Sequence, residues 1–306
     1  MLRLKGILFI IAGSMLWGAT GPMMQWILTE SDMTVPFLLT IRMMIAGTLL
    51  LLFMAMRKKR IFEIWKASHW RRQLLIFSIF GSLGVQFTFV GAIDASNAVV
   101  ATLLQFIAPI FVVIYVSLKV KKWPPMYQLG GIVGILVGLF LLMTNGSVQH
   151  LLVSTEGLLW GVALGFAFAF YTLYPARLMK EWDIIVVVGW SMLIGGLILG
   201  VITTVWNSTE WSTLAQPSMG IMMMLLIFFG TLAFVLFFTS MKYISAVETS
   251  ILSSVEPLTA MVVSMIWFGS MLKGFQLVGA FLMLIFVTYL SVGGGRKEEE
   301  EASVAQ

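Results

Sequence analysis

The chain has 306 residues, of which 59% are hydrophobic and only 11% are charged. This apolar content exceeds what a soluble domain of this length can bury, so the composition excludes a soluble enzyme and a disordered chain. The absence of cysteine excludes a disulfide scaffold, and a net charge of +5 requires no nucleic acid as partner. We therefore expect an all-α integral membrane protein.

Ten apolar stretches are long enough to cross a membrane, because about 20 helical residues span the hydrocarbon core. The first is interpreted as a retained span and not as a cleaved secretory signal, since its apolar run continues to full length. The connections are too short for a second domain, and the charged end at 293–306 is predicted to be a disordered tail. The ten predicted spans are 4–28, 35–56, 73–93, 98–118, 126–144, 156–178, 184–206, 219–240, 246–268 and 275–292.

The basic residues indicate the orientation of these spans. Of the 19 Lys and Arg residues, all but Arg42 and Lys273 fall on one side of the predicted arrangement. Lys and Arg in short loops are retained in the cytoplasm. We expect a multi-pass protein of a bacterial plasma membrane, with both termini cytoplasmic.

The sequence repeats itself weakly at an offset of about half its length. At offset 148, Ala98 and Pro109 fall on Ala246 and Pro257, and at offset 151 Trp17 falls on Phe168. Each half holds five spans, so the second copy would enter the membrane from the opposite face. Chance similarity among apolar helices is the alternative, but it explains matched prolines less well. The prediction is two inverted five-helix repeats, 1–145 and 146–292.

Glu256 is the one acidic residue that the predicted spans place near the membrane midplane. Ionisable groups at this depth are costly and are seldom found without a partner or a task. We interpret Glu256 as a cavity carboxyl that contacts substrate or takes up a proton. The structural alternative is a neutral acid bonded to a carbonyl that Pro257 leaves free.

Other residues are candidates for the walls and hinges of a cavity around this carboxyl. Pro109 and Pro257 would break their helices at matched positions, as hinges or as static bends. For polar side chains, interhelical hydrogen bonds are the alternative to substrate contact. The candidate lining residues are Thr102, Gln105, Ser250, Ser253, Gln86, Gln25, Trp17, Phe168, Tyr171 and Tyr174.

Two further charged residues lie inside spans. Arg42 could form an ion pair with Asp32 or Glu30 or contact a lipid phosphate, which we favour over binding of a substrate carboxylate. Glu248 is interpreted as a gate or pairing group, although Lys242 is too distant along a helix to be its neighbour.

These residues together resemble the EamA type of the drug/metabolite transporter superfamily. The resemblance rests on Trp17-Gly18, Arg42, the polar turn at 92–98, Glu256-Pro257 and the run 276–279, and it covers nearly the whole chain. Members commonly carry an acid at the ends of the fourth and ninth spans, where this chain has Lys121 or Lys122 and Ser270. The resemblance implies a ten-helix carrier of small organic solutes with a central cavity.

The sequence thus favours a secondary transporter of a small amphipathic metabolite such as an amino acid. Resemblance alone implies export, and energy would come from the substrate gradient or from protons. Alternatives are a nucleotide-sugar or lipid-linked solute carrier, a non-transporting scaffold or a membrane enzyme. No cofactor or metal is expected, because the chain has no Walker A motif and only two histidines, His69 and His150. Glycine stripes at 130–138 and 157–165 favour packing within a monomer over a homodimer contact.

Overall fold

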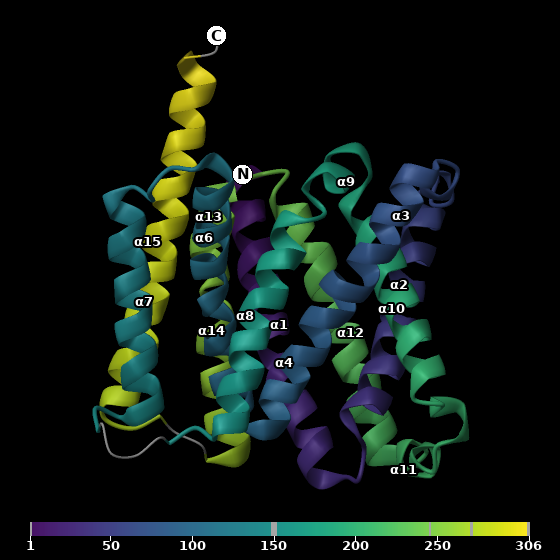
Figure 1. The fold of residues 1–306 in the computed structure, drawn as a ribbon. Helices are drawn as coiled ribbons and strands as arrows, with labels where there is room; N and C mark the ends of the chain where they lie inside the picture. The colour runs from purple at the N-terminus through teal and green to yellow at the C-terminus, as the bar shows by residue number, and fades with distance from the viewer. Residues whose placement is uncertain (1, 148–151, 245, 270–271, 305–306) are drawn as a thin grey trace.

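The computed structural model describes residues 2–147, 152–244, 246–269 and 272–304. Every regular element among these residues is a helix. The helices form one upright bundle in which both termini lie at the same end (Figure 1). Helices α3 and α9 lie at this end too, whereas α11 lies at the opposite one.

Eight helical segments are long and apolar enough to cross a membrane. Six of them are single helices. The first four of these are α1 (Leu2–Glu30), α2 (Val35–Met56), α7 (Met126–Thr144) and α8 (Thr155–Leu173). Two more are α10 (Ile184–Ile202) and α12 (Pro217–Ser240). These bounds confirm the predicted spans 35–56 and 126–144 to the residue.

The other two segments are composite. The third predicted span consists of α3 (Ser68–Ile76), the π-helical stretch η2 (Phe77–Leu83) and α4 (Gly84–Ala95). The fourth consists of α5 (Ala98–Leu104), the 3-10 turn η3 (Gln105–Ile107) and α6 (Ala108–Val120).

The last two predicted spans correspond to shorter apolar helices. The ninth is divided between α13 (Ala246–Ser253) and α14 (Val255–Phe268). The tenth is the apolar part of α15 (Phe275–Val304). Short connecting helices complete the chain: η1 (Glu63–Trp65), α9 (Ala176–Glu181), η4 (Val205–Asn207) and α11 (Glu210–Leu214).

Three predicted spans end at least four residues away from the ends of their helices in the structure. The sixth span ends at Leu173 and not at 178, because Pro175 has no amide hydrogen with which to continue the helical hydrogen bonds. The seventh ends at Ile202, and the left-handed Thr204 (φ 49°) separates it from η4. Where the sequence predicts a disordered tail, α15 continues to Val304, since its glutamates are good helix formers.

Side-chain caps fix several helix ends near one face of the bundle. The Asn97 side chain accepts a hydrogen bond from the Val100 amide at the start of α5 (2.9 Å), and Ser154 accepts one from Gly157 at the start of α8 (3.0 Å). Asn145 ends α7 in the left-handed conformation (φ 50°). The Asn97 cap lies in the short turn that joins α4 to α5.

The helices pack in a small number of extensive pairs. Helix α2 packs on α10, α7 on α15, α4 on α8, and α1 on both α12 and α14. Glycines allow the closest approaches: Gly138 faces Gly279 across the α7–α15 contact, and Gly161 faces Leu104 across α8 and α5. The two glycine stripes therefore make contacts within the chain.

Candidate functional site

The fourth and ninth predicted spans are both interrupted just before a proline. In the fourth, η3 separates α5 from α6, and Pro109 lies in the first turn of α6. In the ninth, α13 ends at Ser253 and α14 begins at Val255, with Pro257 in its first turn. A proline fits a first turn because that turn has backbone amides without helical acceptors. The breaks occur where the sequence predicts them, and their role as hinges stays a prediction.

A cavity of about 120 Å³ lies beside these two interruptions. Its lining comes from both halves of the chain, with side chains from α1, α2, α4, η3, α8, α10, α12 and α14 among others. Seven of the residues singled out in the sequence line it: Trp17, Arg42, Gln86, Gln105, Phe168, Tyr171 and Glu256.

Two hydrogen-bonded pairs supply the polar groups of the central cavity, the name used below for this space. The Gln105 side-chain amide donates to Oε1 of Glu256 at 3.2 Å, which joins η3 to α14. The Arg42 guanidinium donates through Nη1 to Oε1 of Gln86 at 2.7 Å, which joins α2 to α4. Arg42 is only 3% exposed, whereas Glu256 retains some exposure to the cavity.

Aromatic rings form much of the apolar wall. Trp17 packs edge-on against Phe234 with ring centroids 4.6 Å apart. The ring centroid of Tyr171 lies 6.0 Å from that of Phe168 and 5.1 Å from that of Phe77. Such walls suit a solute with an apolar part and leave few polar groups to orient it.

Gly18 fixes the position of the Glu256 backbone. A Cβ atom at residue 18 would overlap the carbonyl oxygen of Glu256 and crowd Thr259. Only glycine therefore allows α1 to approach the first turn of α14 this closely. This contact gives both residues of the Trp17-Gly18 pair a physical role. Trp17 lines the cavity, and Gly18 allows close packing of α14, the helix that carries Glu256.

Several predicted lining residues lie elsewhere. Thr102 is buried, and its hydroxyl donates to the Ala98 carbonyl one turn earlier (2.7 Å). Tyr174 stacks on Phe170 with centroids 4.7 Å apart, and Ser253 is not among the residues that line the cavity. Ser250 lies in α13, but its side chain is outside the described part of the structure.

Gln25 also has a structural task instead of a place in the cavity. Its side-chain oxygen accepts a hydrogen bond from the Ala98 amide at the start of α5 (2.8 Å). This bond satisfies a first-turn amide of α5 from the neighbouring helix α1. The interhelical alternative noted in the sequence therefore holds for Gln25.

The structure corrects the expected partner of Arg42. Glu30 and Asp32 are exposed near the end of α1, and neither forms an ion pair with Arg42. The Arg42 side chain instead turns into the bundle, where Nη1 also lies 3.5 Å from Sδ of Met24. Buried polar contacts within the bundle replace the predicted ion pair near the membrane surface.

Glu248 forms an ion pair with Arg3, a partner that was not considered in the sequence. Nη2 of Arg3 lies 2.6 Å from Oε1 of Glu248, and Nε donates to the same oxygen at 3.0 Å. This ion pair joins α1 to α13 at the end of the bundle that holds both termini.

Sequence reasoning missed some of the lining. Thr20, Ser82, Phe89, Met192 and Phe234 also line the central cavity. Helical spacing could have predicted that three of them line the cavity. Thr20 follows Trp17 by three residues, and Ser82 and Phe89 flank Gln86 by four and three, so each lies on the same helix face as a predicted residue.

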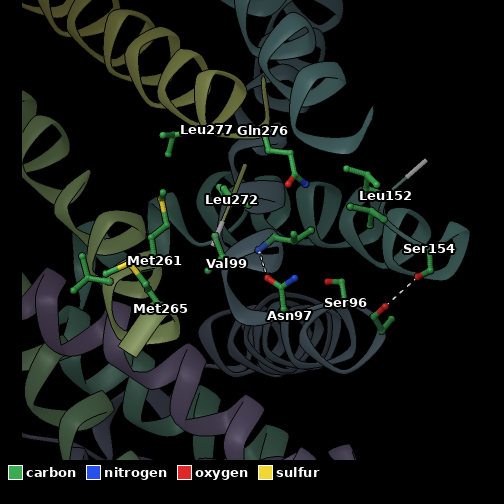
Figure 2. Close-up of a pocket in the computed structure, with 14 residues that line it drawn as sticks. Ser96, Asn97, Val99, Leu152, Ser154, Met261, Met265, Leu272, Gln276 and Leu277 are labelled. Atoms are coloured by element: carbon green, nitrogen blue, oxygen red, sulfur yellow. Dashed lines mark hydrogen bonds between the residues drawn. The ribbon is translucent and has the colours of Figure 1, made fainter. Parts of the chain in front are cut away.

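A second, larger cavity of about 530 Å³ lies at the other end of the described α5 helix. Figure 2 shows its lining, which comes from the α4–α5 turn, the connection before α8, and the facing ends of α14 and α15. Ser96, Asn97 and Ser154 are its polar residues at the turns, and Ser154 donates to the Ala95 carbonyl (3.0 Å). Gln276 also lines it and donates to the Leu142 carbonyl (3.1 Å). We call this space the end cavity.

Among the described residues that line the end cavity there is no predicted site residue, and none is a lysine, an arginine or an acid. Among the described residues, no three His, Asp or Glu side chains are grouped so that they could hold a metal ion.

Comparison with known proteins places this arrangement in a family. The profile of the EamA-like transporter family matches the chain twice, over residues 4–144 and 155–292. An uncharacterized inner membrane transporter of Salmonella typhimurium, YicL, is 37% identical over 295 residues, which cover 96% of this chain and 97% of the relative. An uncharacterized transporter of Synechocystis, sll0355, is 24% identical over 93% of this chain and 89% of the relative.

A solved structure described only as that of a protein shares the fold. Its TM-score is 0.61 at 15% sequence identity, covering 97% of this chain and 99% of the other. The two profile matches, the similarity to YicL and the membrane-spanning helices agree with one another. The chain belongs to the EamA-like transporter family and is a multi-pass membrane transporter.

Proposed function

We propose that this transporter is a secondary carrier that exports a small amphipathic metabolite such as an amino acid, by alternating access around the central cavity. One observation carries the proposal. Arg42, Gln86 and Gln105 from the first half and Glu256 from the second half all face one small cavity with aromatic walls. Transporters with repeated halves place their substrate between the halves, near the membrane midplane.

The packing of the helices supports an inverted repeat of residues 1–145 and 146–292. The two family matches begin 151 residues apart and end 148 residues apart, which are the offsets of the internal similarity. If each helix is exchanged with its counterpart, the α1–α12 contact becomes the α8–α4 contact, and α1–α14 becomes α8–α6. The α2–α10 and α7–α15 contacts convert into themselves. A two-fold exchange of this kind is what rocking of one half against the other requires.

Three features support the direction and the hinges. The interruptions before Pro109 and Pro257 are the hinges about which α6 and α14 tilt. The basic loops and both termini share one end of the bundle, which is the cytoplasmic end by the positive-inside rule. The end cavity lies toward the opposite face and is the outer vestibule. From Val99, which lines it, to Gln105 at the central cavity is about 9 Å along the helix axis.

Glu256 is the proton-binding group of the proposed cycle. It faces the cavity, and in the described structure its side chain accepts a hydrogen bond from the neutral Gln105. A carboxyl at membrane depth that has no cationic partner is a functional candidate by default. Uptake of a proton from one side and its release to the other would couple export to the proton gradient.

The test is solute counterflow with the full chain in proteoliposomes, with and without a pH gradient. The panel comprises amino acids, amphipathic drugs and nucleotide sugars. We expect exchange of an amino acid and stimulation by the pH gradient. Glu256→Gln should lower the exchange rate at least tenfold and abolish the stimulation, because glutamine keeps the shape but takes up no proton.

Glu156→Gln is the matched control. This residue is exposed in the first turn of α8, and its substitution removes the same charge outside the cavity. It should leave both rate and pH response unchanged. Native rate and native pH dependence in Glu256→Gln would contradict the proton role, and exchange of nucleotide sugars alone would contradict the substrate class.

A further inference from the structure

Arg42 is a buried cation in the wall of the central cavity. It lies on α2 among side chains of α1 and α4, and it is 3% exposed. Its Nη2 atom also approaches Gly230 of α12, at 3.6 Å from the position of an added Cβ. Four helices therefore enclose the guanidinium and exclude bulk water from it.

The charge of this guanidinium is not balanced by the described part of the chain. There it donates hydrogen bonds to the neutral Gln86 and Met24, both through Nη1, and no described carboxylate lies within ion-pair distance. A guanidinium has five N–H donors, and those on Nε and Nη2 have no described acceptor. A buried charge without a partner is costly, so its retention indicates a ligand that supplies the opposite charge.

The cavity limits what this anion can be. Its volume of about 120 Å³ is roughly that of four water molecules in the liquid, so it admits a small group. The planar fork of a guanidinium matches both oxygens of a carboxylate. A phosphate monoester would bring almost two negative charges toward a single cation and toward Glu256 in the same wall.

Other residues of the cavity lining have the complementary chemistry. Glu256 and Gln105 offer oxygen acceptors that suit an ammonium group, and Trp17, Phe89 and Phe168 offer an apolar surface. A ligand with a carboxylate, an amine and an apolar side chain satisfies all three parts of the lining.

We propose that Arg42 binds the carboxylate of a zwitterionic substrate, with Gln86 holding the guanidinium in place. The inference rests on the proposed function and narrows its substrate to α-amino acids bearing a free carboxylate. Arg42 is thereby a specificity-determining residue. Because Gln86 is neutral, it holds the guanidinium without cancelling the positive charge of Arg42, which stays available to the ligand.

The experiment compares ligands that differ only in the carboxylate. Each standard amino acid is tested as a competitor in counterflow and as a stabiliser of the full chain against heat in detergent, beside its carboxamide. We expect the best amino acid to compete at least tenfold better than its carboxamide. Because this comparison uses the native chain, it does not depend on the folding of a variant.

Variants then assign the preference to Arg42. Arg42→Gln should bring the acid and its carboxamide to equal affinity, and Arg42→Lys should retain a weaker preference. Arg57→Gln is the matched control, because Arg57 follows the other end of α2 and is exposed. It should keep the native ratio.

The outcomes separate this inference from the proposed function. Exchange of acid and carboxamide at equal affinity would overturn the role of Arg42 while transport stands. Stabilisation by amino acids without any counterflow would overturn transport while the carboxylate site stands. Equal stabilisation by chloride or by inorganic phosphate would overturn the inference, since a simple anion would then satisfy Arg42.

Discussion

The two cavities differ in the chemistry of their linings as well as in size. The end cavity is about 530 Å³ and is lined by helix ends and apolar side chains, with its polar side chains occupied in capping turns. The central cavity is about 120 Å³, yet it holds a buried arginine and a carboxyl contributed by different halves of the chain. Uncompensated ionisable groups are costly inside a membrane, whereas space between helix ends is not. The smaller cavity is therefore the better candidate for recognition.

Equal insertions into the two cavities would sharpen this comparison most. Val85→Trp fills the central cavity, and Val262→Trp places the same bulk in the end cavity at a half-exposed position. We expect Val85→Trp to reduce counterflow more than tenfold and Val262→Trp to reduce it less than threefold. The measurement is initial exchange rate normalised to protein reconstituted. A larger loss from Val262→Trp would identify the end cavity as the principal site.

Much of the fold could be predicted because long apolar runs have clear ends. Residues 35–56 begin beside Pro36 and residues 126–144 end at Asn145, and the structure has these bounds. The interruptions of the fourth and ninth predicted spans both fall beside prolines that the sequence marks. The end of the sixth span is harder to predict, since the apolar residues Ala176, Leu178 and Met179 follow Pro175.

The site could be predicted only in part. In a membrane, the outer faces of helices are apolar too, so composition does not show which way a helix is turned. Gln86 and Gln105 face the cavity, whereas Thr102 bonds its own helix and Gln25 caps another. Arg42 could be paired on paper with the nearby Asp32, and only tertiary packing reveals that it turns inward.

The contact between α1 and α14 offers a second, smaller test of the central cavity. Gly18→Ala adds a single carbon that would overlap the Glu256 carbonyl, so α14 must shift. We expect about 1–3 kcal/mol of destabilisation, as is usual for overpacking, and a several-fold loss of counterflow. Thermal unfolding in detergent and exchange rate are measured together.

Gly130→Ala is the control for this substitution. Gly130 is also a helical glycine facing the membrane region, but no atom lies within 4 Å of an added Cβ there. It should leave transport unchanged and raise stability by about 0.5–1 kcal/mol, because alanine favours the helical conformation more than glycine does. Equal effects of the two substitutions would mean that they act through helix propensity and not through the contact between Gly18 and the Glu256 backbone.

The smallest effect is expected at the ion pair between Arg3 and Glu248, far from both cavities. Three quarters of the Arg3 side chain is exposed, so water and salt weaken its attraction to Glu248 despite the 2.6 Å distance. A double-mutant cycle with Arg3→Gln and Glu248→Gln should give a coupling of about 0.2–1 kcal/mol that falls as salt is added.

Because the pair joins α1 to α13 across the two halves, its loss should also favour opening at the end that holds the termini. Single cysteines can report this opening by labelling, since the chain has no native cysteine. A coupling above 2 kcal/mol that is insensitive to salt would show that the pair is shielded from solvent and acts as a lock. Surface charge would then rival the buried arginine in controlling the carrier.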